Sequence, residues 1–137
     1  MRKVCNLLVA TVAMLVMGSC HEKKTFDSLG GEWDVVAIGE MAVPDSVDAF
    51  MGFDIAEQLV YGSTGCNRLT GALPAEIEPE APMFAAMGST RRMCADMTVE
   101  DAMLPALGRV VDFKVDGTSL CLLDVAGNTV MLLEKRF

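Results

Sequence analysis

The chain has 137 residues, the length of a single domain, and its 19 acidic residues outnumber its 11 lysines and arginines, for a formal net charge of −8. An acidic surface is repelled by a phosphate backbone, so this balance argues against a nucleic-acid partner. The single histidine excludes multi-histidine metal sites and leaves Ser-His-Asp catalysis with only one candidate base.

The first twenty residues have the features of a bacterial export signal. Arg2 and Lys3 give a positive start, a mainly apolar stretch follows, and small residues close the segment at Cys20. The apolar stretch is shorter than the roughly 20 residues that cross a bilayer as a helix. Residues 17–20 resemble the lipobox of bacterial lipoproteins, in which the cysteine is acylated. We therefore predict a signal peptide over residues 1–19 and lipidation of Cys20, palmitate included; secretion with a free Cys20 and an uncleaved anchor are the alternatives.

Cleavage before Cys20 would remove two positive charges and no acid, so the mature chain would carry a net charge of −10. Residues 20–28 are predicted to form a tether, with His21 solvated in it, and residues 29–137 to form the domain. Because acyl chains hold a protein to a membrane, the expected location is the bacterial cell envelope. We expect the anchor in the outer membrane and the body in the periplasm or at the surface.

The first half of the domain is predicted to be rich in β-structure. Residues 62–71 are glycine-rich and are expected to be irregular, and the prolines and glutamates of residues 74–82 predict a loop. Four apolar stretches around them are predicted strands, the middle two of which suit a hairpin: residues 31–38, 50–55, 58–61 and 83–87.

One helix is predicted in the second half of the chain. Five apolar residues between Val99 and Leu107 fall on one helical stripe. Thr98 is a suitable N-cap, and Gly108 suits the position after the last turn. Pro105 opposes a helix because it removes one backbone hydrogen bond, but the stripe and both ends favour it.

The C-terminal third is predicted to be a three-stranded meander. Alternating residues and the turn pairs Asp116-Gly117 and Gly127-Asn128 place its strands at 111–115, 120–125 and 130–133. The predicted fold class is therefore α+β, predominantly antiparallel β, with a small curled or barrel-like sheet and one helix.

Five different short motifs follow one another along the domain in a recognisable order. They are Leu29-Gly30-Gly31-Glu32-Trp33, Gly65-Cys66-Asn67-Arg68-Leu69-Thr70-Gly71, Ser89-Thr90-Arg91-Arg92-Met93-Cys94, Ala106-Leu107 and Leu120-Cys121-Leu122-Leu123-Asp124. In order and spacing they resemble the META domain family (HslJ-like bacterial envelope proteins) over roughly residues 29–134. Pro105 in the helix and a short strand before Cys66 are the departures from the family pattern.

The resemblance implies a small barrel-like β-domain with one helix packed across it, often in a lipoprotein or secreted protein linked to stress response. It supplies no catalytic residue and no ligand. We therefore expect a non-enzymatic binding or stress-related envelope component without cofactor or metal, since the glutamates at 76, 78 and 80 lack the spacing of a calcium loop. Its expected partners are the membrane, through Cys20, and an envelope protein or a small apolar ligand.

The cysteines carry the most specific residue-level prediction. Signal cleavage and lipidation of Cys20 leave Cys66, Cys94 and Cys121 in a compartment that permits disulfides. We predict a Cys66–Cys94 bridge, which would stabilise the fold by about 3–4 kcal/mol in the chain-entropy model; two reduced core thiols are the alternative. Cys121 is expected to be a buried small residue within a strand. The wide spacing of all the cysteines argues against redox or zinc motifs.

Three arginines flank the two predicted bridge cysteines. Arg68, Arg91 and Arg92 are candidate contacts for an anionic group or a partner, and the alternative is that they offset neighbouring acids. Asn67 is expected to satisfy the backbone of a turn. An enzyme of unrecognised type that uses Cys66, Asn67, Arg68 and the pair Arg91 and Arg92 is the alternative to a binding function.

Overall fold

The structure is a computed structural model in which residues 24–137 are described. The predicted signal peptide, the lipidation site Cys20 and His21 lie outside the described residues. The described chain holds the following elements in order: η2 (Asp27–Leu29), β1 (Gly31–Ile38), β2 (Met41–Ala42), β3 (Ala49–Asp54), β4 (Leu59–Thr64), β5 (Arg68–Ala72), β6 (Met87–Ser89), α1 (Thr98–Leu107), β7 (Asp112–Asp116), β8 (Ser119–Leu123) and β9 (Thr129–Lys135).

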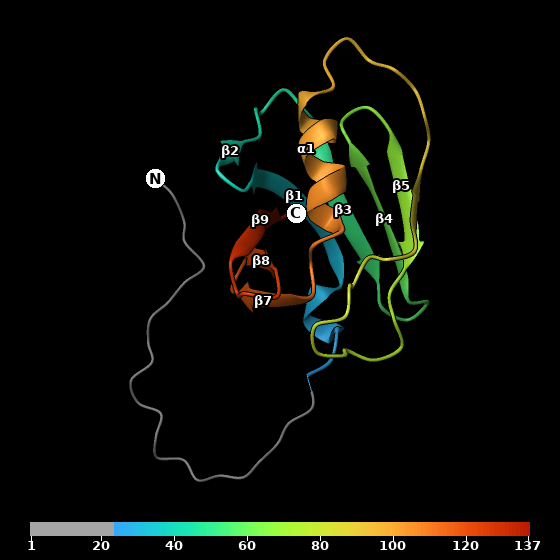
Figure 1. The fold of residues 1–137 in the computed structure, drawn as a ribbon, viewed down its shortest axis with the longest axis vertical. Coiled ribbons are helices and arrows are strands. Elements are labelled where there is room, and N and C mark those ends of the chain that lie inside the picture. The colour runs from blue at the N-terminus through green and yellow to red at the C-terminus, as the bar shows by residue number, and fades with distance from the viewer. Residues whose placement is uncertain (1–23) are drawn as a thin grey trace, which may run out of the picture.

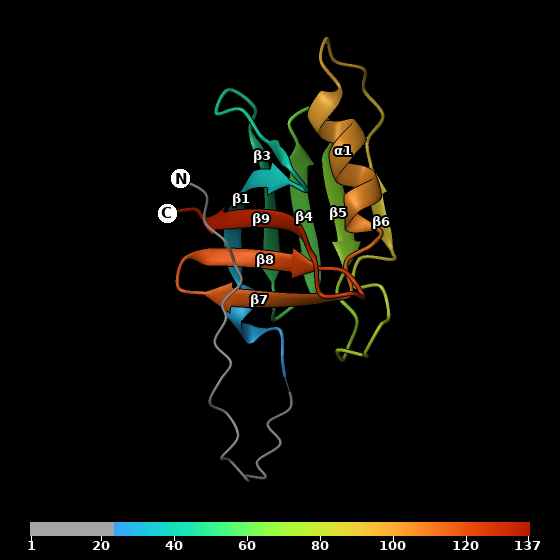
Figure 2. The same ribbon diagram turned by 60° about the vertical axis from the view of Figure 1, so that its left-hand side comes forward.

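All of these strands belong to one antiparallel sheet, with the order β6-β5-β4-β3-β1-β9-β8-β7 and with β2 paired to β1. The sheet curls strongly, so that β3, β4 and β5 stand upright behind β9, β8 and β7, which cross in front of them (Figure 2). The end strands β6 and β7 are not paired with each other. The predicted fold class is confirmed, in the form of a curled open sheet with one helix.

The core lies inside the curl and is covered on one side by α1, which contacts β1, β4 and β9 (Figure 1). Alternation along β1 directs Trp33 and Val35 inward, where both are buried. The indole N–H of Trp33 donates to the carbonyl oxygen of Leu29 at 2.8 Å, which satisfies the one polar atom of this core side chain. Cys121 is buried in β8.

Close approach of an aromatic ring explains one glycine on the outer face of the sheet. Gly52 of β3 lies opposite Tyr61 of β4, and a Cβ at Gly52 would lie 2.3 Å from Cζ of the Tyr61 ring. The ring therefore covers the strand where only glycine leaves room for it. The Tyr61 hydroxyl reaches across β3 and donates to a Glu32 carboxylate oxygen on β1 at 3.0 Å.

The helix is confirmed, with differences at its ends. Thr98 is the first helical residue rather than the N-cap, and its N–H donates to a carboxylate oxygen of Asp96 at 2.9 Å. Hydrogen bonding from the Thr98 side chain, and next from its N–H, holds the pKa of Asp96 below its usual range. Gly108 is the C-cap with a right-handed φ of −70°, so its conformational freedom is not used. Pro105 lies within the last turn, which the apolar stripe keeps packed on the sheet.

Two sequence predictions in the first half of the domain are wrong. Residues 83–87 do not form a strand: Met83 and Phe84 are buried in a turn, and the strand begins only at Met87. Residues 62–71 are largely regular, because β4 extends to Thr64 and β5 begins at Arg68. Pairing with neighbouring strands outweighs the high glycine content there. The hairpin β3–β4 and the C-terminal meander β7–β8–β9 are confirmed.

The start of the described chain is attached to the edge strand β7. The Lys24 ammonium donates to the Asp112 carboxylate at 2.8 Å and to the Phe113 carbonyl oxygen, and it lies 4.3 Å from the centre of the Phe113 ring. Phe26 is buried and stacks on Phe113 with ring centres 5.9 Å apart. The chain is therefore held against the domain from Lys24 onward. None of the described helices is long and apolar enough to cross a membrane.

Candidate binding site

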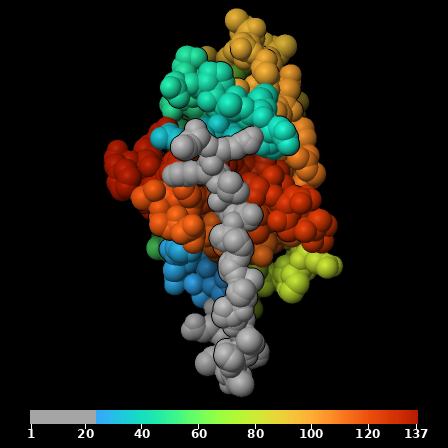
Figure 3. Space-filling model, turned by 90° about the vertical axis from the view of Figure 1, so that its left-hand side faces the viewer, coloured from blue at the N-terminus to red at the C-terminus, as the bar shows by residue number. Residues whose placement is uncertain are grey.

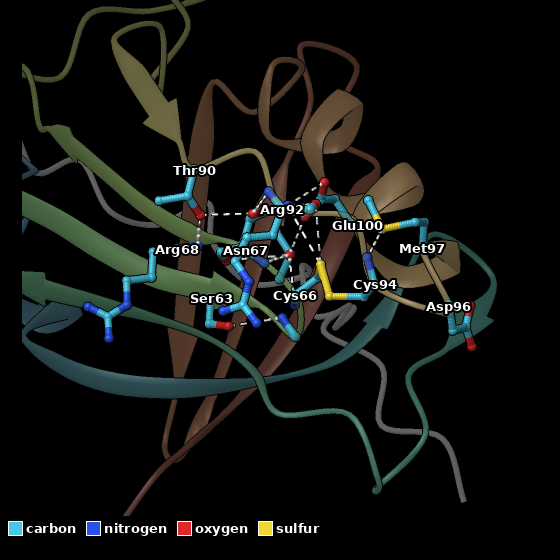
Figure 4. The surroundings of a disulfide bond; sticks show 12 residues. Ser63, Cys66, Asn67, Arg68, Thr90, Arg92, Cys94, Asp96, Met97 and Glu100 are labelled. Carbon is cyan, nitrogen blue, oxygen red and sulfur yellow. Dashed lines mark hydrogen bonds between the residues drawn. A yellow bond between two sulfur atoms is a disulfide. The ribbon is translucent and has the colours of Figure 1, made fainter.

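A disulfide joins the turn between β4 and β5 to the segment that leads into α1. Cys66 and Cys94 are bonded with an S–S distance of 2.08 Å and a Cα–Cα distance of 5.9 Å. The predicted pair is thus the pair that the structure forms. The bond fixes the residues before α1 against the end of the β4–β5 hairpin (Figure 4).

The Asn67 side chain is the centre of a hydrogen-bond network beside this disulfide. Its Oδ1 accepts from the Arg92 N–H at 2.6 Å and from the Thr90 hydroxyl at 2.8 Å. Its Nδ2 donates to the Arg92 carbonyl oxygen at 3.0 Å and to the Glu100 carboxylate at 2.8 Å. Asn67 is 2% exposed, so these contacts satisfy both ends of a buried amide (Figure 4).

The two hydrogen bonds to Arg92 continue the backbone ladder between β5 and β6. The register pairs Leu69 with Ser89, and Thr90 N–H donates to the Arg68 carbonyl oxygen at 3.1 Å. In this register Arg92 would next face the backbone of Cys66, but Cys66 N–H is directed to the Thr64 hydroxyl instead, at 3.2 Å. The Asn67 amide, which carries one donor and one acceptor like a peptide group, takes the place of the missing backbone pair.

Glu100 closes the network from the first turn of α1. Its carboxylate accepts from the Thr64 hydroxyl at 2.6 Å as well as from Asn67, and the residue is only 8% exposed. The carboxylate is therefore stabilised by the Thr64 hydroxyl, by the Asn67 amide and by the positive end of the helix dipole. No buried side-chain nitrogen or oxygen of the described residues lacks a hydrogen-bond partner.

The three candidate arginines lie on the segments that form this network, directly before or after its residues in the chain. Arg68, Arg91 and Arg92 are all exposed, and none of them forms an ion pair with a described residue. Whether they contact an anionic group or offset neighbouring acids through longer-range attraction stays a prediction. Met93 lies beside them and is 84% exposed. We call Arg68, Arg91, Arg92 and Met93 the arginine surface.

Comparison with known proteins agrees with this architecture. The family model of the META domain matches residues 25–137. The chain belongs to the META domain family. No curated protein matches it.

Solved structures share the fold of this META domain. An NMR structure of a protein from Burkholderia xenovorans is 18% identical, with a TM-score of 0.63 over 93% of this chain and 99% of that one. A second NMR structure is 17% identical, with a TM-score of 0.60 over 81% and 94% of the two chains. A crystal structure of a DUF4847 family protein from Bacteroides vulgatus is 14% identical, with a TM-score of 0.55 over 79% and 94%. At these identities the likeness establishes the fold alone.

The residues of this META domain that the sequence analysis missed are Thr64, Thr90 and Glu100. Each has an ordinary local explanation in the sequence: a strand residue, a loop residue and an acid at a helix start. Their convergence depends on tertiary packing across three elements. Asn67 does satisfy backbone groups, as expected, but those of residue 92 rather than of its own turn.

Other candidate sites of the META domain lie at the opposite end from the arginine surface. Two neighbouring pockets of about 410 and 230 Å³ share Ala75, Glu76 and Ile77 in their lining. The second pocket also includes Lys24 and Leu73. Within the described part of the chain, no group of three or more His, Cys, Asp or Glu side chains is arranged to hold a metal ion.

Proposed function

We propose that this META domain is a non-enzymatic binding module of the bacterial cell envelope. A lipid on Cys20 attaches it to the outer membrane, and the arginine surface contacts an acidic partner. The proposal includes a role under envelope stress, which the resemblance to the META domain family suggests. The observation that carries the proposal is the placement of the two ends: the tether meets the domain at one end, and the arginine surface lies at the other.

The figures show this polarity directly. The described chain begins beneath the β7–β8 hairpin, whereas the segment around residues 90–97 projects at the far end of the molecule (Figures 1 and 3). Only three residues separate Cys20 from the attached Lys24. Four peptide units span at most about 14 Å, so a lipid on Cys20 would hold the Lys24 end close to the bilayer. The arginine surface would then face away from the membrane.

The composition of the arginine surface is that of a contact surface. Arginine and methionine are enriched in protein–protein interfaces, and an exposed large apolar side chain between cations gains from being covered. The remaining molecule is strongly acidic, so unpaired guanidinium groups would select an anionic partner by charge. The chemistry of the site favours binding over catalysis, because the polar groups of Asn67 and Glu100 are engaged with each other. The pockets beside Lys24 favour the alternative of a small apolar ligand.

Two measurements test the proposal. Mass spectrometry of the full chain recovered from bacterial membranes should find Cys20 as the first residue with acyl groups attached. In-cell crosslinking should then capture a partner that is lost when Arg91 and Arg92 are both changed to Glu. The matched control changes Arg109 and Lys114 to Glu, which alters the net charge equally on exposed side chains elsewhere. An intact N-terminus would refute the lipid anchor. Equal loss of the partner in both double variants would refute the role of the arginine surface.

A further inference from the structure

We propose that residues 87–92 form an open strand edge that binds an extended acidic segment of a partner polypeptide by strand addition. The proposal rests on the proposed function and names the partner chemistry of the arginine surface. It comes from the direction of the backbone groups along this segment, which the register and the hydrogen bonds define.

Even-numbered residues of the segment bond inward. Thr90 N–H donates to the Arg68 carbonyl oxygen, so the register places Gly88 opposite Thr70 as the next hydrogen-bonded pair. Arg92 bonds through both backbone groups to the Asn67 side chain. The pairing of β4 with β5 supports this assignment, because the residues that bond toward β4 are odd-numbered. Leu73 N–H donates to the Gln58 carbonyl oxygen, and Thr64 N–H donates to the Asn67 carbonyl oxygen. This phase leaves the even-numbered residues of β5 to bond with β6.

Odd-numbered residues of the segment are therefore directed away from the sheet. The N–H and C=O groups of Met87, Ser89 and Arg91 point to the side where β6 has no neighbouring strand. None of these groups is hydrogen-bonded to another part of the described chain. Ser89 and Arg91 are exposed, and Met87 is half-buried. A peptide laid along this edge would thus meet a ladder of regularly spaced donors and acceptors.

The segment is held in an extended form without a partner. Arg92 is fixed by Asn67, Cys94 is fixed by the disulfide, and Thr90 is fixed by hydrogen bonds from its hydroxyl to Asn67 Oδ1 and from Arg68 N–H to that hydroxyl at 2.9 Å. The short strand β6 is thereby prolonged by three residues at its C-terminal end. Such preorganisation lowers the ordering cost of binding, since only the peptide has to be ordered.

Charge identifies the occupant. Arg91 and Arg92 lie on the segment itself and Arg68 lies on the adjacent strand, all without an ion-pair partner among the described residues. Two copies of this edge would repel each other, which disfavours pairing of the protein with itself. A polypeptide with carboxylates at alternate positions would combine backbone hydrogen bonds with charge-assisted contacts.

The test uses the full-length chain and a fluorescent peptide of about seven residues in which Glu and Val alternate. Its binding is followed by anisotropy at low salt. Ser89→Pro removes one outward N–H and leaves the inward ladder intact, so affinity should fall by about tenfold or more. Ser89→Ala is the matched control, because it removes the same hydroxyl but keeps the N–H; its affinity should equal that of the parent. A peptide with N-methyl groups on alternate residues should also fail to bind.

Amide hydrogen exchange gives a readout that does not depend on the variants. In the free protein the amides of Thr90 and Arg92 should exchange slowly and those of Ser89 and Arg91 rapidly. Binding of the peptide should protect Ser89 and Arg91 specifically. If Ser89→Pro does not fold, this pattern and the N-methylated peptide decide the matter.

Several outcomes would overturn the inference. They are no peptide binding, equal affinity of the two Ser89 variants, and unchanged exchange at Ser89 and Arg91. If anionic phospholipid vesicles bind in place of the peptide, and do so equally well to both Ser89 variants, the edge is not a strand template either. These outcomes leave the proposed function to its own tests. Those tests are the lipid on Cys20 and the loss of the crosslinked partner when Arg91 and Arg92 are changed to Glu.

Discussion

Replacement of Asn67 by Ala is the sharpest test of how the site is held together. The substitution removes the hydrogen bonds of the amide with both backbone groups of Arg92, with the Thr90 hydroxyl and with both oxygens of the Glu100 carboxylate. Water can compensate the exposed Thr90 hydroxyl, but Glu100 is 8% exposed and would retain only the Thr64 hydroxyl as a side-chain partner. The cost of the substitution is therefore mostly the cost of leaving a buried carboxylate underpaired.

The magnitude follows from the groups left without partners. A buried group without its hydrogen bond costs about 1–3 kcal/mol; the part-buried Arg92 backbone lies at the lower end and the buried Glu100 carboxylate at the upper end, which gives about 3–5 kcal/mol together. For a domain of this size the midpoint of thermal unfolding should fall by about 10–20 °C. Urea unfolding of Asn67→Ala, with the disulfide intact, measures the free energy directly.

A double-mutant cycle isolates the role of the carboxylate. In a Glu100→Ala background no carboxylate is left underpaired, so Asn67→Ala should cost about 1–2 kcal/mol less than in the parent. The isosteric variant Asn67→Asp places a second carboxylate against Glu100. It should therefore be at least as unstable as Asn67→Ala at neutral pH, because two carboxylates would face each other where an amide donates in the parent. A cost below about 1 kcal/mol, or an equal cost in both backgrounds, would refute the reasoning.

Three further predictions concern other contacts. Replacing Cys66 and Cys94 together by Ser should lower the free energy of unfolding by about 3–4 kcal/mol, and a dithiol reductant should then destabilise the parent more than the variant. Burial, and then the hydrogen bond to Glu32, raise the pKa of Tyr61 above 10.0, so this one tyrosine should titrate late in ultraviolet absorbance and earlier in Glu32→Gln. The stability linked to Tyr61 is present below pH 10 and is lost as the pH rises through the higher folded-state pKa, which alkaline unfolding curves should show. Gly52→Ala should destabilise by about 1–3 kcal/mol through its clash with the Tyr61 ring, and the effect should shrink in a Tyr61→Ala background.

Local sequence patterns predicted the elements that local physics controls. The stripe from Val99 to Leu107 needed only helical spacing, and the C-terminal meander needed only alternation and turn residues. The prediction for residues 62–71 was wrong because two of their three glycines, Gly62 and Gly71, allow close packing between strands, and only Gly65 lies in the turn with a positive φ. The prediction of a strand at 83–87 was wrong because a run of apolar residues can also form a buried turn.

Some residues of the candidate site could likewise be predicted from local sequence patterns, and others could not. The cysteine pair and the three arginines were accessible from the sequence because their residue types and their neighbourhood in the chain are distinctive. Glu100 was not, because an acid at the start of a helix is common and its burial depends on β4 and β5 lying beneath it. Asn67 was assigned to its own turn, since nothing in the local pattern says that its amide would serve a segment 25 residues later.

The position of Asn67 links the stability of the fold to the proposed strand edge. β6 itself has only three residues, which is short for a strand that binds a peptide. Because the Asn67 amide replaces the backbone of residue 66, the edge continues to Arg92, where the arginines begin. Glu100 in turn fixes the rotamer of Asn67 from the helix. Loss of Asn67 should thus release the arginine-bearing end of the edge before β6 is disturbed, so peptide affinity should fall in Asn67→Ala and should stay close to that of the parent in Gly52→Ala, which destabilises the fold away from this edge.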